Sequence, residues 1–370
     1  MQTNIKTVTT FFTKSKEVTE LKNSILQKSQ PANILGLVGS SLSFVVSESF
    51  KESEKPFLLI LEDKETAAYY LNDLEQLLGE KNLLFYPASY RRAYQIEETD
   101  NANVLLRAEV LNRINSRRKP AIIVTYPEAL FEQVITKKEL EKNTLKLQIG
   151  DEVNLDFINE VLFEYQFNRV DFVSEPGEFA VRGGIIDVFS YSNDEPYRIE
   201  FFGDEIDSIR TFDVETQLSE EKLKKIAIVP NVANKQLEEK RQSFLQYIAS
   251  KTIIFTKDLD FLKGKLDQLF LKAEKAYQNL QGEINQAKPQ ELFCNGTLIE
   301  QEIKEFTFVS INKVIADKTI LFKTKPQPSF NKQFDLVIAN FKENTKNGLQ
   351  NFLFCDNQKQ VDRFAEIFND

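Results

Sequence analysis

The chain has 370 residues, of which 42% are hydrophobic and 28% charged, so it holds enough apolar material for two or three folded domains. It contains no histidine and two distant cysteines, which excludes a Ser-His-Asp or Cys-His relay, a His-ligated zinc site and a disulfide framework. The formal net charge of −9 disfavours phosphate binding over the whole surface, so any nucleic-acid contact has to be local. No run of about 18 apolar residues is present and the N-terminus is polar, which predicts a cytoplasmic protein.

Residues 1–141 alternate predicted strands and helices in the manner of a doubly wound parallel sheet. An amphipathic stretch with Val18, Leu21 and Ile25 on one face comes first. The predicted strands lie at 34–38, 57–61, 83–86 and 121–124, with helices between them. This segment is expected to be the first half of an α/β domain.

Residues 142–218 break that rhythm with a helix near 154–164 and short strands at 170–173, 179–181, 185–189, 197–202 and 206–212. They hold 6 Lys/Arg against 17 Asp/Glu, a net charge of −11, whereas the rest of the chain carries about +2. The change predicts an inserted small α+β domain with an antiparallel sheet.

The α/β pattern then returns over 219–328, with strands at 226–229, 252–255, 306–309 and 319–322 and a long helix over 258–286. Residues 329–370 contain a linker, a strand at 352–356 and a helix through Val361 and Phe368. We expect this last piece to be the truncated start of a further α/β domain.

A glycine-containing loop, Gly36, Gly39, Ser40 and Ser41, lies between a predicted strand and helix, where a phosphate-binding loop would be. Such a loop needs a lysine after its last glycine to reach the β and γ phosphates, and here Ser40 takes that place. We therefore interpret it as a small-residue turn that lets the helix pack closely, and expect no cofactor there.

The acidic insert carries a second constellation. Strand alternation places Tyr197, Ile199 and Phe201 on one face and Arg198 and Glu200 on the other. Arg182 and Asp187 are expected to join the polar face, and Arg169 and Arg210 also fall within the insert. Three interpretations stay open: a solvated surface of salt bridges, a nucleic-acid site, which the acidic background disfavours, and a protein-partner site.

A third group of residues is basic: Arg91, Arg92, Arg107, Arg113, Arg117, Arg118 and Lys119. A solvated helix face is the favoured interpretation. Stacking of Tyr86, Tyr90 and Tyr94 on nucleobases is the alternative.

Several of these segments resemble the N-terminal region of bacterial transcription-repair coupling factors (the Mfd family). The resemblance covers nearly the whole chain and includes 36–41, 84–88 and 123–127. Its most specific part is 177–189 followed by 198–205, a paired signature that is shared with the excision-repair protein UvrB.

The resemblance implies a helicase-like α/β domain split by an insert that binds UvrA. Residues 1–141 would correspond to domain 1a of UvrB, 142–218 to domain 2 and 219–328 to domain 1b. The implied UvrA contacts are Arg169, Arg182, Asp187, Arg198 and Glu200, with Phe179 as an apolar anchor.

Two departures from UvrB imply lost activity. The phosphate loop lacks its lysine, and no room exists between Tyr86 and Val104 for a long DNA-gripping hairpin. The family's ATP- and Mg-dependent DNA translocase and its RNA-polymerase-binding domain are not in these residues. The resemblance thus implies a non-catalytic module, without metal, that recruits UvrA; the alternatives are a UvrB-like nucleotide- and DNA-binding enzyme and a clamp on the motor domains of a parent protein.

Overall fold

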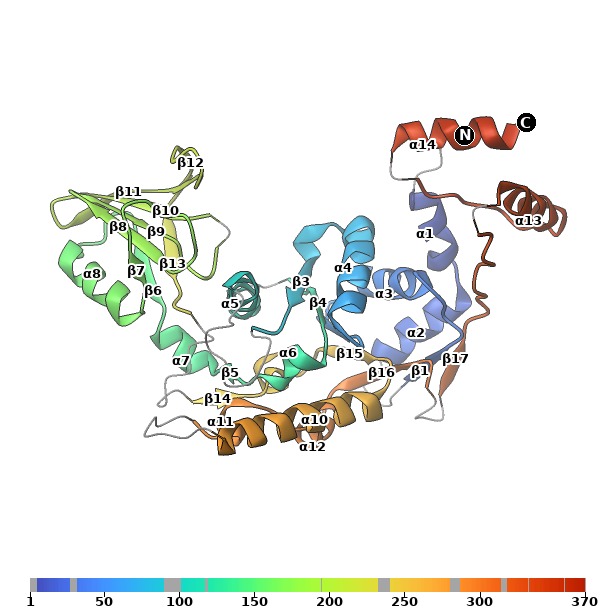
Figure 1. The fold of residues 1–370 in the computed structure, drawn as a ribbon, viewed down its shortest axis with the longest axis horizontal. Helices are drawn as coiled ribbons and strands as arrows, with labels where there is room; N and C mark the ends of the chain where they lie inside the picture. Colours follow the sequence, from blue (N-terminus) through green and yellow to red (C-terminus); the bar gives the residue numbers. More distant parts are fainter. Residues whose placement is uncertain are drawn as a thin grey trace. The chain divides into compact units, whose positions relative to one another are not determined.

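The computed structural model describes residues 5–26, 32–89, 101–116, 119–193, 195–231, 240–279, 287–313, 318–331, 333–355 and 357–369. The chain divides into two compact units, Met1–Thr324 and Lys325–Asp370. The first unit contains a parallel sheet flanked by helices and a separate antiparallel sheet (Figure 1). The predicted fold class is therefore confirmed.

The parallel sheet has seven strands. Their order is β17 (Thr319–Leu321), β1 (Ala32–Leu35), β16 (Thr307–Ile311), β15 (Ile253–Thr256), β2 (Phe57–Ile60), β4 (Ile122–Thr125) and β3 (Leu83–Tyr86). Every residue of β2, β4 and β15 is buried, as expected of central parallel strands that are covered on both faces. The apolar runs of the sequence thus form the centre of the sheet.

Helices pack on both sides of this sheet. Figure 1 shows α3 (Ser41–Lys51) and α4 (Lys64–Leu78) on one side and α10 (Leu259–Gln278) and α12 (Gly296–Ile303) on the other. The amphipathic helix α2 (Lys16–Leu26) buries Val18, Leu21 and Ile25, as predicted. The remaining helices of this unit are α1 (Ile5–Thr13), η1 (Glu80–Asn82), α5 (Asn101–Ser116), α6 (Pro127–Phe131), α7 (Lys137–Lys142), α8 (Leu155–Glu164), α9 (Phe244–Tyr247) and α11 (Pro289–Leu292).

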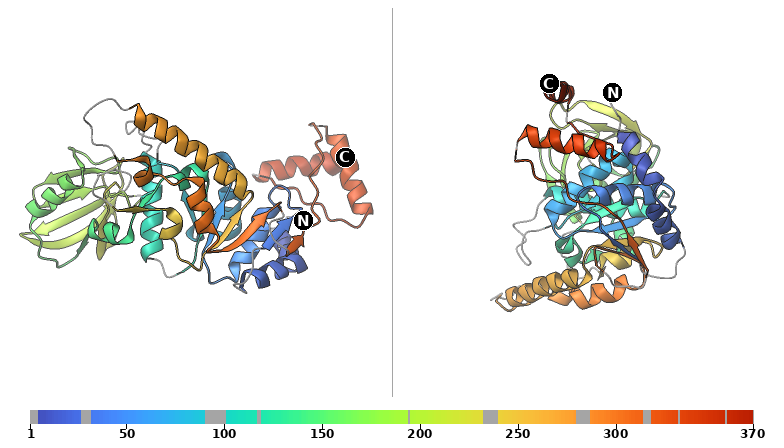
Figure 2. Two further views of the ribbon diagram at one scale, coloured as in Figure 1. Left: turned by 90° about the horizontal axis from the view of Figure 1, so that it is seen from below. Right: turned by 90° about the vertical axis from the view of Figure 1, so that its right-hand side faces the viewer.

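The second sheet has six strands and lies apart from the parallel sheet (Figure 2, left). Its order is β12 (Ser219–Leu223), β11 (Glu205–Phe212), β10 (Tyr197–Phe202), β9 (Ile185–Val188), β8 (Glu178–Arg182) and β7 (Asn168–Arg169). All pairs are antiparallel except β7 with β8. The predicted strand at 170–173 is wrong, because the short edge strand ends at Arg169. The predicted boundary at 218 precedes β12, whose five residues belong to this sheet.

A two-stranded ribbon joins the two sheets. Strand β6 (Leu145–Gln148) leads into the insert, and β13 (Lys225–Ile228) leads out of it, paired antiparallel to β6. The strand that we expected at 226–229 in the returning α/β pattern is therefore outside the parallel sheet. A second short ribbon pairs β5 (Val134–Ile135) with β14 (Arg241–Gln242).

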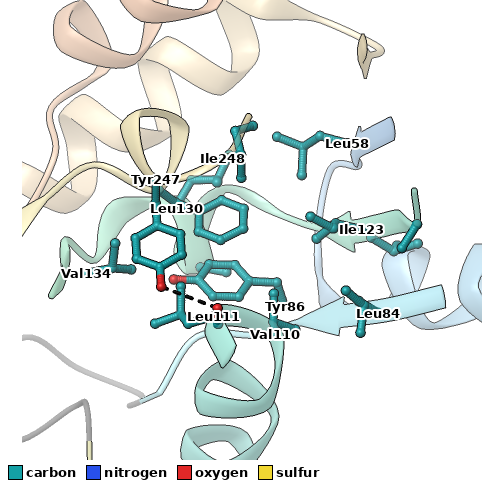
Figure 3. Packing of buried hydrophobic residues seen from close by; sticks show 14 of the residues in the cluster. Leu58, Leu84, Tyr86, Val110, Leu111, Ile123, Leu130, Val134, Tyr247 and Ile248 are labelled. Carbon is teal, nitrogen blue, oxygen red and sulfur yellow. Dashed lines mark hydrogen bonds between the residues drawn. The ribbon is translucent and has the colours of Figure 1, made fainter. Parts of the chain in front are cut away.

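One hydrophobic cluster extends from the parallel sheet into the insert and includes residues of both, such as Leu58 and Ile199. Figure 3 shows its part around Tyr86 and Tyr247, where the hydroxyl of Tyr247 donates to the carbonyl oxygen of Leu111 at 3.3 Å. Tyr86 stacks on Phe244 with ring centroids 3.9 Å apart. The hydrophobic cluster is thus continuous between the α/β domain and the insert, and includes Leu147 and Ile226 of the ribbon.

The second unit contains α13 (Phe334–Lys346) and α14 (Gln358–Asn369). Their rings meet at Phe341 and Phe368, with centroids 5.5 Å apart. The predicted C-terminal helix is confirmed. Residues 352–355 form no strand, so the strand predicted at 352–356 is wrong over its described part.

Candidate functional site

The two faces of the six-stranded sheet differ in chemistry. Ile186, Ile199 and Ile209 are paired in register and buried on the inner face, which α8 covers. On the outer face Asp187 pairs with Arg198, and Arg198 pairs with Arg210. We call the charged residues of this outer side the arginine face: Arg182, Asp187, Arg198, Glu200 and Arg210.

Asp187 is the centre of the arginine face. Its side chain is 0% exposed and accepts two hydrogen bonds from Arg198, from Nε at 2.7 Å and from Nη2 at 2.9 Å. Arg182 also pairs with it through Nη2. The hydrogen bond to Asp187 raises the pKa of Arg198 above its ordinary value, although burial acts in the opposite direction. A buried carboxylate therefore holds two guanidinium groups in fixed positions.

A second ion pair lies beside the first. Glu200 pairs with Arg210 through Nη2 and accepts a hydrogen bond of 2.7 Å from the hydroxyl of Ser208. Nε of Arg210 is buried and has no hydrogen-bond partner among the described residues. The arginine face thus carries three guanidinium groups and two carboxylates, on a domain that is acidic as a whole.

Aromatic rings surround these charges. Arg198 lies over the ring of buried Phe212 at 4.5 Å, and Arg182 lies 5.3 Å from the ring centroid of Phe172. Phe202 ends β10, two residues after Glu200, and is 84% exposed. Arginine forks beside exposed aromatic rings are typical of the energetic centre of protein interfaces.

The family of the insert follows from its sequence. Residues 145–233 match the family model of the UvrB interaction domain. This segment is therefore similar to the UvrB interaction domain. The match covers the whole six-stranded sheet and both strands of the ribbon.

Similar proteins agree with this assignment. Transcription-repair-coupling factor of Bacillus subtilis is 32% identical over 224 residues, which cover 60% of this chain and 19% of that protein. The protein of the same name from Staphylococcus haemolyticus is 23% identical over 400 residues, which cover 91% of this chain and 34% of that protein. UvrABC system protein B of Thermosipho africanus is 29% identical over 266 residues, which cover 68% of this chain and 39% of that protein. The predicted resemblance to the UvrB-like N-terminal region of transcription-repair coupling factors is confirmed, and the chain spans about a fifth to two fifths of these relatives' lengths.

The insert brings most of the predicted site residues together. Arg182, Asp187, Arg198 and Glu200 lie on one face, and Arg169 is exposed on the edge strand β7. Asp187 is 0% exposed beneath its two arginines, so the prediction that it contacts a partner directly is wrong. Phe179 is 0% exposed and packs edge-on against Phe163 of α8 at 5.2 Å. The prediction that Phe179 is an apolar anchor for a partner is therefore wrong, because its ring belongs to the core.

Arg210 of the arginine face and the neighbouring Phe202 were missing from the predicted site. Arg210 was noted in the insert but not assigned, and its register opposite Arg198 places it on the arginine face. Phe202 follows Arg198 and Glu200 at a spacing of two residues, so the period of two predicts its outward position, although the pairing of β10 with β11 shifts register after Glu200. That signal was present in the sequence and points to Phe202 as the exposed aromatic of the face.

The serine side chains of the glycine loop form hydrogen bonds within the chain. Ser41 donates to the carbonyl oxygen of Val38 at 2.7 Å and accepts from its N–H at 2.8 Å. The hydroxyl of Ser40, at the position of the missing lysine, is 2.6 Å from the hydroxyl of Tyr69. Both hydroxyls are thus used within the chain. Gly36 has φ +77°, and a Cβ there would lie 2.0 Å from the carbonyl oxygen of Phe322.

Part of the predicted basic patch is buried and does not lie on the surface. Arg107 is buried and donates from Nη1 to the carbonyl oxygens of Pro87 at 2.8 Å and Ala129 at 3.1 Å, while Nη2 lies 3.4 Å from Glu132. Its guanidinium lies over the ring of Tyr86, which is itself buried. The interpretation of Arg107 as part of a solvated face and of Tyr86 as a base-stacking residue is therefore wrong. The following residues of that prediction lie outside the described residues: Tyr90, Arg91, Arg92, Tyr94, Arg117 and Arg118.

Within the described ranges, no group of three or more Cys, Asp or Glu side chains is arranged to hold a metal ion. The same ranges contain no helix that is long and apolar enough to cross a membrane.

Proposed function

We propose that this chain is a non-catalytic recruitment module that binds UvrA through the arginine face and so couples transcription to nucleotide excision repair. The observation that carries the proposal is the pair of guanidinium groups of Arg182 and Arg198, held by buried Asp187 inside a segment similar to the UvrB interaction domain. Exposed Phe202 at the end of the same face supplies an apolar contact. Similarity to transcription-repair-coupling factors and to UvrABC system protein B supports the role.

The proposal assigns no nucleotide chemistry to the chain. Its support is the serine at the lysine position and the internal bonds of Ser40 and Ser41. RNA polymerase, DNA, ATP and Mg are proposed to engage other domains of a longer protein, as in the ATP-dependent translocases of the coupling-factor family.

The experiment is a calorimetric titration of the purified chain with UvrA from the same organism. We expect saturable binding that is weakened about 30-fold or more by Arg182→Glu or Arg198→Glu, because loss of an interface hot spot costs about 2 kcal/mol or more. Arg363→Glu on α14 makes the same change of charge at an exposed position outside the first unit and is the matched control.

Two results contradict the proposal. If Arg182→Glu and Arg198→Glu both leave the affinity for UvrA unchanged, the arginine face is not the UvrA site. Saturable binding of Mg-ATP without binding of UvrA favours instead the UvrB-like enzyme, which remains the second candidate. Titration with Mg-ATP is therefore run in parallel.

A further inference from the structure

Phe172 is an exposed aromatic residue beside the arginine face. It follows β7 by three positions and is 65% exposed. The parallel pairing of β7 with β8 continues in the bond from the N–H of Val170 to the carbonyl oxygen of Phe179. This register carries the chain alongside β8 and places Phe172 next to Arg182.

Arg182 is held on both sides at this point. Nη2 pairs with buried Asp187, and Nη1 donates to the carbonyl oxygen of Asp171 at 3.2 Å. Its guanidinium carbon lies 5.3 Å from the ring centroid of Phe172, within the range of a cation–π contact. Ring and guanidinium therefore form one preorganised block, of which Phe172 is largely exposed and Arg182 is 39% exposed.

The second exposed ring lies at the same end of the sheet. The N–H of Phe201 donates to the carbonyl oxygen of Gly184 at 2.8 Å, so the end of β10 adjoins the turn that follows Arg182. Phe172 and Phe202 thus lie on the two sides of the β8–β9 turn, with Arg182 at its start.

We propose that Phe172 and Arg182 act as one recognition unit for UvrA, so that the partner-binding surface extends from the arginine face across the start of β8 to the segment after β7. The unit fits an apolar side chain of the partner against the Phe172 ring and a carboxylate or carbonyl oxygen at the Arg182 guanidinium, since that guanidinium remains 39% exposed. A fixed ring and fork bind at a lower cost in side-chain entropy than two free side chains. This inference rests on the proposed function.

The test is a double-mutant cycle on UvrA affinity with Phe172→Ala, Arg182→Ala and the double variant. We expect Phe172→Ala to weaken binding about tenfold, as a residue worth about 1.4 kcal/mol does. The double variant is expected to lose clearly less than the product of the two single losses, because either change disrupts the shared unit. Phe172→Tyr keeps an aromatic ring over the guanidinium and is expected to bind within about twofold of the unchanged chain.

Phe157→Ala is the matched control. Phe157 is also an exposed phenylalanine of the insert, 51% exposed, but it lies on α8, which covers the opposite face of the sheet. We expect its affinity for UvrA to be unchanged.

The outcomes separate this inference from the function on which it rests. Normal UvrA affinity of Phe172→Ala, or losses that multiply in the double variant, overturns the recognition unit even where Arg198→Glu and Phe202→Ala abolish binding. An equal loss in Phe157→Ala also overturns it, because the effect is then not confined to this surface. Absence of UvrA binding by the unchanged chain overturns the proposed function and this inference together.

Discussion

Asp187 and Arg198 lie directly opposite each other on β9 and β10, and their carboxylate and guanidinium form two hydrogen bonds of 2.7 and 2.9 Å. Asp187 is fully buried, yet both of its arginine partners reach the surface. The carboxylate is therefore a structural support for charges that face outward. Without the two arginines the Asp187 carboxylate would be a buried charge with no counter-ion, which is costly because the carboxylate has lost its hydration.

Replacement of this carboxylate tests its role as a support. We expect Asp187→Asn to lower the free energy of unfolding by about 2 to 3 kcal/mol, because two partly buried arginines lose their ionic partner. Asp207→Asn removes an exposed carboxylate of the neighbouring strand β11 and is expected to change stability by less than about 0.5 kcal/mol. Urea unfolding of both variants makes the comparison, and equal stabilities would contradict the supporting role.

Phe179 and Phe202 are predicted to behave in opposite ways. Phe179→Ala removes a ring from the core and should lower the free energy of unfolding by about 3 to 5 kcal/mol. Phe202→Ala removes an exposed ring and should leave stability within about 0.5 kcal/mol while it weakens UvrA binding. Chemical denaturation followed by titration of the folded variants with UvrA measures both effects. A stable Phe179→Ala that selectively loses UvrA would restore Phe179 as a partner contact.

The glycine loop offers a matched pair of substitutions. Gly36 and Gly39 both have positive φ, +77° and +56°, but only Gly36 has an atom in the path of a Cβ, the carbonyl oxygen of Phe322. We expect Gly36→Ala to lower the free energy of unfolding by about 3 kcal/mol or more. Gly39→Ala should lower it by only about 1 kcal/mol, the cost of holding an alanine in the left-handed backbone conformation. Thermal or urea unfolding distinguishes them. Equal costs would show that Phe322 moves away without penalty.

Asp63 gives a pH-dependent prediction. It caps α4 by accepting the N–H of Thr66 at 2.7 Å, and this backbone hydrogen bond, followed by that of the Thr66 side chain, lowers the pKa of Asp63. Because the folded-state pKa lies below the unfolded one, its stabilisation is fully present above the unfolded pKa and is lost as the pH falls through the folded pKa.

Substitutions at Asp63 separate the hydrogen bond from the charge. Asp63→Ala should lower the free energy of unfolding by about 1 kcal/mol at neutral pH. Asp63→Asn keeps an acceptor but cannot ionise, so the stability difference between the unchanged chain and this variant should shrink as the pH falls from about 6 toward 3. Urea unfolding at a series of pH values measures this stability difference. A difference that is constant with pH would show that the charge of Asp63 does not contribute to stability.

Much of the parallel sheet was predictable because its strands are short apolar runs between turn residues. The strand expected at 57–61 is observed as Phe57–Ile60, and the one expected at 83–86 has those bounds. The ribbon strand Lys225–Ile228 was predicted as a strand but placed in the wrong sheet, since burial pattern alone does not specify a partner strand. The same limit applies to Arg107, whose burial depends on carbonyl oxygens and a carboxylate from distant segments.

The sequence predicted on which face of the sheet the site residues lie, but it did not predict how deeply each of them is buried. Alternation along β10 correctly put Arg198 and Glu200 on one face. It could not reveal that Asp187, on that same face, is enclosed by arginines, or that Phe179 is covered by Phe163 of α8. Both outcomes depend on contacts between elements that the sequence pattern does not encode.

The ribbon of β6 and β13 gives the insert neighbouring points of entry and exit. Gln148 pairs with Lys225, and the N–H of Ile149 donates to the carbonyl oxygen of Lys224 at 3.1 Å. Two chain ends cut at this level lie about one strand spacing apart, roughly 5 Å. A two-residue turn is long enough to close the α/β domain there, and the excised piece has adjoining termini. The insert therefore enters and leaves the α/β domain at a single place, so the host chain is interrupted at one point while its sheet stays continuous.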